Sequence, residues 1–276
     1  MPGIFGKVVR PAILAASRSD GLRHTAERLP VTRDVVHRFV PGETVADALT
    51  SVAVLRDSGR LVSIDYLGED VTDGEAATAT VRAYLALLDA LATRTEPSAE
   101  PRPLEVSLKL SALGQALPRD GEKIALENAH AICTKARDVG AWVTVDAEDH
   151  TTTDSTLSIV RDLRADFDWL GTVLQAYLFR TEADCAEFAA SGARIRLCKG
   201  AYDEPASVAF RDRAAVTDSY LRCLRVLMAP YGYGQFHHTA WIHLVALVRA
   251  LFADCVSFYL YSTFYCTRFR VWFLPF

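Results

Sequence analysis

Charged and amide side chains that could do chemistry occur in four short β-type segments of this sequence. They are Lys109, Asp146, Gln175 and the pair Arg196 and Lys199, each at or near the C-terminal end of its segment. A buried strand rarely carries Lys or Arg unless a partner or a ligand compensates the charge. Such a set could form a Schiff base with a carbonyl substrate, or it could hold an anionic substrate beside a bound cofactor.

Each cationic position also has a structural interpretation. Lys109 and Asp146 could form an ion pair inside the core. Arg196 and Lys199 lie three positions apart, so a regular strand would direct them to opposite faces unless it bends at Gly200. The set as a whole therefore supports a functional site more strongly than any one member does.

Three further residues near strand ends are ambiguous in the same way. Glu69 follows Gly68 at a strand end, where ordinary turn chemistry also places such a residue. Tyr202 could form a wall of the core, and Gln175 could be a hydrogen-bonded core amide.

These residues lie on a strand–helix pattern that occurs five times. The predicted strands are 60–69, 104–111, 142–149, 171–178 and 194–202, and helices follow each of them, the first opened by a capping box of Thr72 and Glu75. Five such units predict parallel strands with right-handed crossovers, either in a (β/α)8 barrel or in a doubly wound sheet. In both folds ligands bind at the C-terminal edge of the strands. No Gly-x-Gly-x-x-Gly follows the first strand, so we expect no Rossmann dinucleotide site.

The composition argues against several classes of function. Half of the 276 residues are hydrophobic, the net charge is −4, and there is no basic run of the kind that binds nucleic acid. The six scattered cysteines contain no C-x-x-C pair and indicate reduced, cytosolic thiols. His150 is the only histidine at a strand end, so we expect no metal site. The N-terminal residues lack a secretory apolar core and are read as an ordinary helix.

Residues 230–276 differ sharply from the rest of the sequence. They contain 14 of the 27 aromatic residues, no lysine and a single acid, Asp254. A membrane anchor over 241–260 is disfavoured, because Arg249 and Asp254 would each cost about 2.5 to 3.5 kcal/mol near a helix centre. We expect this tail to be a frameshifted or otherwise aberrant end.

Five motifs, in this order and spacing, make most of residues 30–229 resemble the proline dehydrogenase family. They are D-Y-L-G-E (65–69), V-S-L-K-L-S (106–111), V-D-A-E-D-H (145–150), L-Q-A-Y (174–177) and R-L-C-K-G-A-Y (196–202). The resemblance implies a distorted (β/α)8 TIM-type barrel that binds FAD at its C-terminal mouth. It also implies oxidation of L-proline to 1-pyrroline-5-carboxylate, the first step of proline degradation to glutamate, with a membrane quinone as electron acceptor. A cytoplasmic location follows, with peripheral association at the inner face of the membrane as an option.

The resemblance also implies roles for individual residues. Asp146 and Arg196 match catalytic positions; Lys109, Tyr202 and Glu69 match substrate-binding positions; Ala147, Gln175, Lys199, Gly200 and Ala201 match FAD-binding positions. In the family, the counterpart of Glu69 pairs with a substrate-binding arginine near the C-terminus.

The resemblance stops after residue 229, where three further strands and an arginine pair of the family have no counterpart in the sequence. We therefore expect an N-terminal helical segment (1–59), a partial barrel with five of eight strands (60–229) and a non-matching hydrophobic tail (230–276). Five strands cannot close an eight-stranded barrel, and an open edge promotes aggregation, so we expect the chain as written to be insoluble or inactive. A Schiff-base lysine aldolase on the same barrel and an inactive truncated fragment remain the alternatives.

Overall fold

The computed structural model describes residues 44–57, 61–66, 68, 70–94 and 104–229, with two short strands at 256–258 and 273–275. The helices expected before residue 44 and nearly all of the predicted tail lie outside the described residues. The chain divides into two compact units, 1–53 and 54–276. The described part of the first unit is the start of helix α4 (Val45–Asp57), where Thr44 and Asp47 exchange hydrogen bonds of 3.1 and 3.2 Å between backbone N–H groups and side-chain oxygens.

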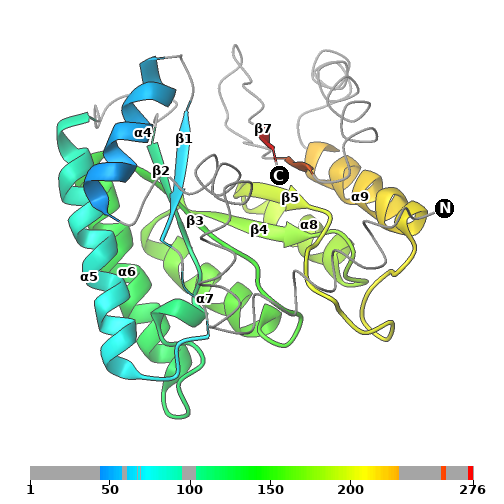
Figure 1. The fold of residues 1–276 in the computed structure, drawn as a ribbon. Helices are drawn as coiled ribbons and strands as arrows, with labels where there is room; N and C mark the ends of the chain where they lie inside the picture. The colour runs from blue at the N-terminus through cyan, green and yellow to red at the C-terminus, as the bar shows by residue number, and fades with distance from the viewer. Residues whose placement is uncertain are drawn as a thin grey trace, which may run out of the picture. The chain divides into compact units, whose positions relative to one another are not determined.

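The second unit is built on a parallel five-stranded sheet. Its strands are β1 (Val62–Asp65), β2 (Leu104–Leu108), β3 (Trp142–Val145), β4 (Gly171–Gln175) and β5 (Arg194–Cys198), and they lie side by side in chain order (Figure 1). The register places Asp65 opposite Ser107, and Gln175 opposite Cys198. All five predicted strands are confirmed, each shorter than its sequence pattern.

A helix follows each strand, as the sequence predicts. These helices are α5 (Gly74–Leu91), α6 (Gly121–Val139), α7 (Thr153–Asp166), α8 (Thr181–Ala190) and α9 (Arg213–Met228), with 3-10 turns η2 (Ala92–Arg94) and η3 (Ser111–Leu113). Because the strands follow chain order, right-handed crossovers put the helices that connect them on the same face of the sheet (Figure 1). A doubly wound sheet would reverse its order and carry helices on both faces. The described sheet is therefore barrel-type.

The helix ends show how local sequence sets the boundaries. The residue that caps α5 is Asp73, whose side chain accepts a hydrogen bond from the Glu75 N–H at 3.1 Å, so the predicted capping box with Thr72 is wrong. Helix α6 ends at Gly140 as predicted, with a left-handed φ of 74° that glycine adopts without steric cost.

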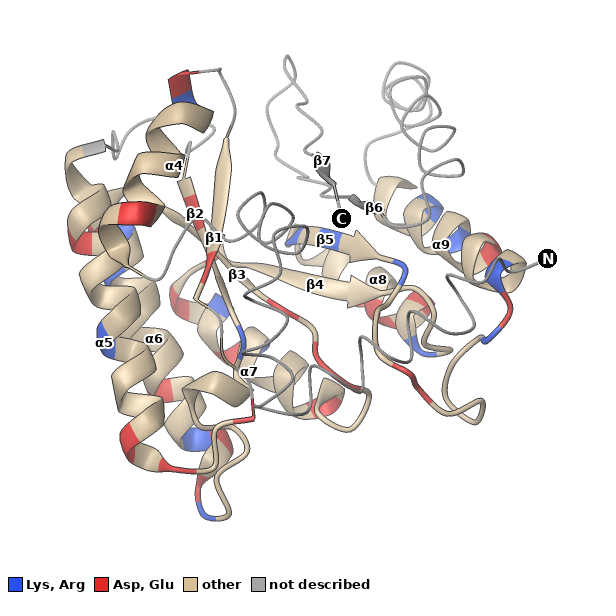
Figure 2. Cartoon of the chain, viewed as in Figure 1, with Lys and Arg blue, Asp and Glu red and all other residues tan. Residues whose placement is uncertain are grey.

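Alternate residues of the strands face two different environments. On β2, Leu104, Val106 and Leu108 are fully buried and alternate with the polar Glu105 and Ser107. Burying one such leucine contributes roughly 1.5 to 3 kcal/mol, so contact with the helices stabilises the apolar face. Glu105 and Ser107 are also buried, and they contact Arg196 of β5 across the intervening strands. Figure 2 shows that charged residues interrupt the strands, most visibly β5.

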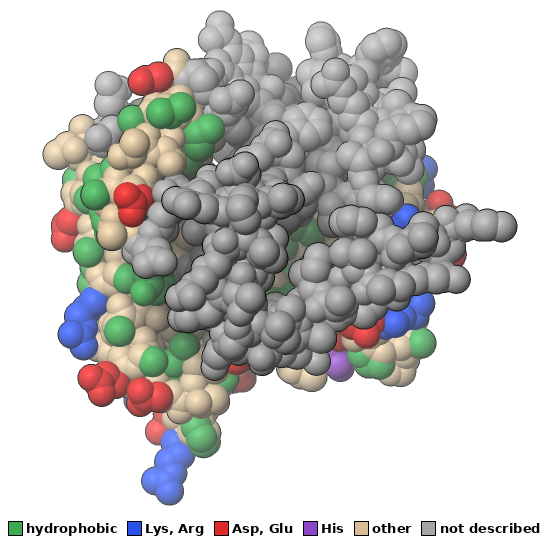
Figure 3. Space-filling view, in the orientation of Figure 1, with side chains coloured by type: hydrophobic (Ala, Val, Ile, Leu, Met, Phe, Trp, Pro, Cys, Tyr) green, Lys and Arg blue, Asp and Glu red, His purple; other side chains and the backbone are tan. Residues whose placement is uncertain are grey.

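Strands β6 (Val256–Phe258) and β7 (Phe273–Pro275) form an antiparallel pair. Among the helices that the structure describes, none combines the length and the apolar character needed to cross a membrane. On the face shown in Figure 3, the coloured surface carries acidic, basic and apolar side chains interspersed.

Candidate active site

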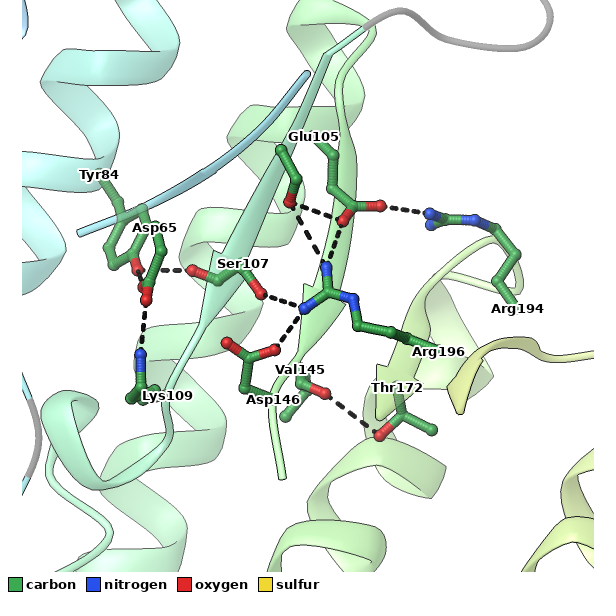
Figure 4. Close-up of polar contacts among 11 residues, drawn as sticks. Asp65, Tyr84, Glu105, Ser107, Lys109, Val145, Asp146, Thr172, Arg194 and Arg196 are labelled. Atoms are coloured by element: carbon green, nitrogen blue, oxygen red, sulfur yellow. Dashed lines mark hydrogen bonds and ion pairs between the residues drawn. The ribbon is translucent and has the colours of Figure 1, made fainter. Parts of the chain in front are cut away.

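The centre of the site is Arg196, which extends from β5 to residues of β2 and of the β3 end (Figure 4). Its Nη2 donates to Glu105 Oε1 at 2.7 Å, and its Nη1 donates to Asp146 Oδ1 at 2.7 Å and to Ser107 Oγ at 3.2 Å. The Arg196 side chain is only 9% exposed, so these charge-assisted hydrogen bonds are largely screened from water. The structure thus brings Arg196 and Asp146 together, while their catalytic roles stay a prediction.

A second arginine lies deeper in the same cluster. Arg194 donates to the other carboxylate oxygen of Glu105, and its guanidinium lies 4.1 Å from the ring centroid of Trp142. Both charged side chains are at most 5% exposed. Sequence reasoning missed Glu105 and Arg194, although charges in the buried patterns L-E-V-S-L and R-I-R-L-C were a usable signal.

Lys109 follows β2 directly, and its ammonium lies 2.5 Å from Asp65 Oδ2. The partner of Lys109 is therefore Asp65 at the end of β1, and not Asp146 as the structural interpretation of the sequence had it. The Tyr84 hydroxyl donates to the Ser107 carbonyl at 2.6 Å and contacts Asp65 Oδ1 at 3.3 Å. Burial raises the pKa of Asp65 above its ordinary value, the charge of Lys109 opposes that rise, and the charge of Asp146 adds to it. Asp65 ends β1, Lys109 follows β2 and Asp146 follows β3, so the Lys109 pair and the Asp146 end of the Arg196 cluster lie at the same C-terminal edge, within electrostatic reach.

We expect Lys109→Met to destabilise the fold more at pH 7 than at pH 4. Without the ammonium, the pKa of Asp65, already raised by burial, rises further. A carboxyl group whose pKa is higher in the folded than in the unfolded state stabilises the fold at pH values below its unfolded pKa of about 3.9. This stabilisation is lost as the pH rises through the pKa of the folded state. Urea midpoints at the two pH values measure this difference, with Asp65→Asn/Lys109→Met as the control that removes the titrating group. Equal deficits of Lys109→Met at both pH values would contradict the assignment of Asp65 as its partner.

Gln175 ends β4 and is 5% exposed. Its Oε1 atom is buried and accepts no hydrogen bond within the described part of the chain, whereas its backbone carbonyl accepts one from Thr181 Oγ1 at 2.6 Å. A buried acceptor left without a donor costs about 1 to 3 kcal/mol. Gln175 is therefore suited to accept a hydrogen bond from a bound ligand.

The stretch that follows β5 does not converge with Arg196. Lys199 Nζ donates to Thr217 Oγ1 of α9 at 3.1 Å, so Arg196 and Lys199 diverge. Gly200 has a φ of +118°, and a Cβ on it would lie 2.3 Å from the Tyr177 ring. In the described residues the group that approaches this glycine is thus an aromatic ring, and a flavin contact there stays a prediction. Ala201 is exposed, while Tyr202 and Ala147 are half-buried.

A separate polar cluster joins the loops after β3, β4 and β5. Glu204, 4% exposed, accepts hydrogen bonds from the His150 backbone N–H at 2.9 Å and from the Tyr177 hydroxyl at 3.2 Å, and it also contacts His150 Nδ1. This cluster fixes the Tyr177 ring over Gly200.

The described residues contain no group of three or more His, Cys, Asp or Glu side chains that could hold a metal ion. Glu69 lies outside the described residues, so its predicted role has no structural counterpart here.

The fold and the site define a parallel α/β barrel-type protein with clustered cations at the C-terminal edge of its strands. The chain belongs to the proline dehydrogenase family, whose family model matches residues 48–246 and so reaches past the predicted boundary at residue 229. It is 37% identical over 192 residues to a proline dehydrogenase of Deinococcus radiodurans, covering 68% of this chain and 60% of that protein. It is also 37% identical over 223 residues to proline dehydrogenase 1 of Bacillus subtilis, covering 81% of this chain and 70% of the relative.

The fold is also similar to a solved structure. A crystal structure of proline utilization A from Bdellovibrio bacteriovorus, inactivated by N-propargylglycine, superposes with a TM-score of 0.63 at 23% identity. The match covers 72% of this chain and 24% of that one. At this level of identity the likeness concerns the fold, which supports the barrel-type assignment.

Proposed function

We propose that this protein uses FAD to oxidise L-proline to 1-pyrroline-5-carboxylate, the first step of proline degradation to glutamate, and passes the electrons to a membrane quinone. The proposal is supported by the family membership and by the two proline dehydrogenases named above. The observation that carries it is the position of Arg196, held between Glu105 and Asp146 at the same sheet edge as Lys109. We also propose a cytoplasmic location, with peripheral association at the inner face of the membrane where the quinone is found.

The residues at this edge fit a flavin. The isoalloxazine ring offers an N–H donor, and the buried Oε1 of Gln175 is an acceptor that lacks one in the described part of the chain. A guanidinium such as that of Arg196 is suited to a ring that becomes anionic when reduced. Gln175, Ala147 and the stretch Lys199–Ala201 would hold the cofactor, which supplies the hydride-accepting chemistry when bound.

The chain's own residues would bind and orient proline. Lys109 would pair with the substrate carboxylate, and because it lies 2.5 Å from Asp65, the substrate must share or displace that contact. Tyr202 would pack on the pyrrolidine ring. Asp146 would orient Arg196 through their 2.7 Å hydrogen bond. Proline must lose its amine proton first, because an ammonium nitrogen has no lone pair with which to expel hydride.

The test is purification of the full chain in the presence of FAD, followed by the absorption spectrum and proline-dependent dye reduction. A flavin-loaded protein that reduces the dye only with proline supports the proposal, and it would overturn the expectation, drawn from the open five-stranded barrel, that the chain is insoluble or inactive. A colourless or inactive protein would favour the truncated-fragment alternative. Borohydride trapping of a substrate imine on Lys109 or Lys199 would favour the aldolase alternative.

The quinone step has its own measurement. Liposomes that contain a ubiquinone analogue should accept electrons from proline through this protein and should bind it reversibly. A protein that reduces the dye but neither binds the liposomes nor reduces their quinone would overturn the acceptor and the location that we propose.

A further inference from the structure

We propose that Glu105, a buried residue of β2 to which the function above assigns no role, is the positioning residue that holds Arg196 in place. This inference rests on the proposed function, because it concerns the guanidinium on which that function depends.

The geometry divides Glu105 between two arginines (Figure 4). Oε1 accepts from Arg196 Nη2 at 2.7 Å and from Ser63 Oγ at 2.8 Å, while Oε2 accepts from Arg194. The three strands that carry Glu105, Ser63 and the arginines are β2, β1 and β5, so the contact spans the sheet. Glu105 therefore fixes one edge of the Arg196 guanidinium, and the other edge is directed at Asp146 and Ser107.

The two carboxylates that contact Arg196 differ in their surroundings. The Glu105 side chain is 3% exposed and that of Asp146 is 18% exposed. A carboxylate buried beside two guanidiniums cannot exchange its partners for water without a large desolvation cost. Asp146 is reached by solvent and can adjust when a ligand binds. Glu105 is thus the rigid anchor and Asp146 the adjustable partner.

Arg194 explains how Glu105 can stay buried as a carboxylate while it anchors Arg196. Its guanidinium contacts the Glu105 oxygen that Arg196 does not, so each oxygen of this buried carboxylate has a cationic partner. A displacement of the reacting geometry by about 1 Å can cost roughly a hundredfold in rate. Because proline's carboxylate is assigned to Lys109, loss of the anchor should lower kcat and leave KM nearly unchanged.

The experiment compares Arg194→Met with Glu105→Leu/Arg194→Met in the FAD-loaded full chain. Arg194→Met keeps the contact between Glu105 and Arg196. The double variant removes the anchor and its second counter-charge together, and replacement of a buried ion pair by apolar groups is often neutral for stability. We expect kcat of Arg194→Met within about threefold of wild type, and a kcat of the double variant at least about tenfold lower, with KM changed less than about threefold. Thermal melting should show that both variants fold.

A double variant that folds and has the wild-type kcat would overturn the positioning role. Loss of proline oxidation in the wild type would overturn the proposed function instead. The two failures are distinguishable because the contact can be measured without catalysis. A double-mutant cycle of Glu105→Gln and Arg196→Met in urea, on the cofactor-free chain in the Arg194→Met background, should show non-additive shifts of the midpoint. Additive shifts would show that Glu105 does not hold Arg196.

Discussion

Arg196→Met is expected to lower kcat for proline oxidation by about 10²- to 10³-fold and the free energy of unfolding by about 3 kcal/mol, the lower end for breaking a buried ion pair. The change removes the cation that Asp146 contacts at 2.7 Å and one of the two that Glu105 contacts. Arg194 still compensates Glu105, and Asp146 is reached by water, which keeps the cost from being larger. Removing one preorganised electrostatic contact to the reacting group typically lowers kcat by about 10²- to 10³-fold. Urea denaturation and proline-dependent dye reduction measure the two effects.

Arg196→Lys is the matched control for this prediction. Lysine keeps the charge but offers a single ammonium in place of the planar fork that contacts Glu105, Asp146 and Ser107 at once. It should therefore recover part of the stability and little of the activity. If Arg196→Met were as stable as wild type, the cluster in Figure 4 would not be holding these strands together.

The alternation of apolar residues and the glycine stops made the strand–helix order predictable from the sequence. Gly140 ends α6 and Asp212 precedes α9 because backbone geometry and capping are local properties of the chain. The choice between a barrel and a doubly wound sheet could not be made from local sequence patterns. It depends on which strands pair, and the sequence pattern is the same for both.

The side-chain partners were the least predictable part of the site. Lys109, Asp146 and Arg196 stood out because buried strands rarely carry charged residues. Their actual partners come from other strands: Asp65 is 44 positions from Lys109, and Glu105 is 91 positions from Arg196. Nothing in a local pattern specifies such a register, so Asp146 appeared to be the natural partner of Lys109 when Asp65 is the residue in contact.

The close contact of the Gly200 backbone was equally hard to predict from local sequence. Its place in R-L-C-K-G-A-Y matched an FAD-binding position of the family, but the group that lies close to this glycine in the structure is Tyr177. Tyr177 is held from one side by Glu204 and, through its backbone N–H, by the Lys199 carbonyl at 2.8 Å. The glycine is therefore required by the packing of two βα loops, whatever ligand binds beside them.

Gly200→Ala should accordingly be among the most damaging single substitutions in this chain. The new Cβ would lie 2.3 Å from the Tyr177 ring, and the φ of +118° is one that residues with a side chain rarely adopt. Overpacking and backbone strain each cost about 1 to 3 kcal/mol, so we expect a combined loss of roughly 2 to 6 kcal/mol. The displaced loop carries Lys199, Ala201 and Tyr202, so affinity for FAD, measured by quenching of flavin fluorescence, should also fall.

Gly192→Ala is the comparison for that loss, because it places alanine on a left-handed backbone where no collision occurs. Gly192 follows α8 with a φ of +66°, but a Cβ there would meet nothing within 4 Å. Alanine at position 192 must adopt the left-handed backbone, but its Cβ collides with nothing. We expect this substitution to cost roughly 1 to 2 kcal/mol and to leave the loop between β5 and α9 in place. The difference in urea midpoint between the two variants measures the contact with Tyr177 together with the more restricted φ of Gly200. Equal midpoints and equal FAD affinities would mean that the Tyr177 ring moves aside freely, and the packing of these two loops would then not explain why glycine occupies position 200.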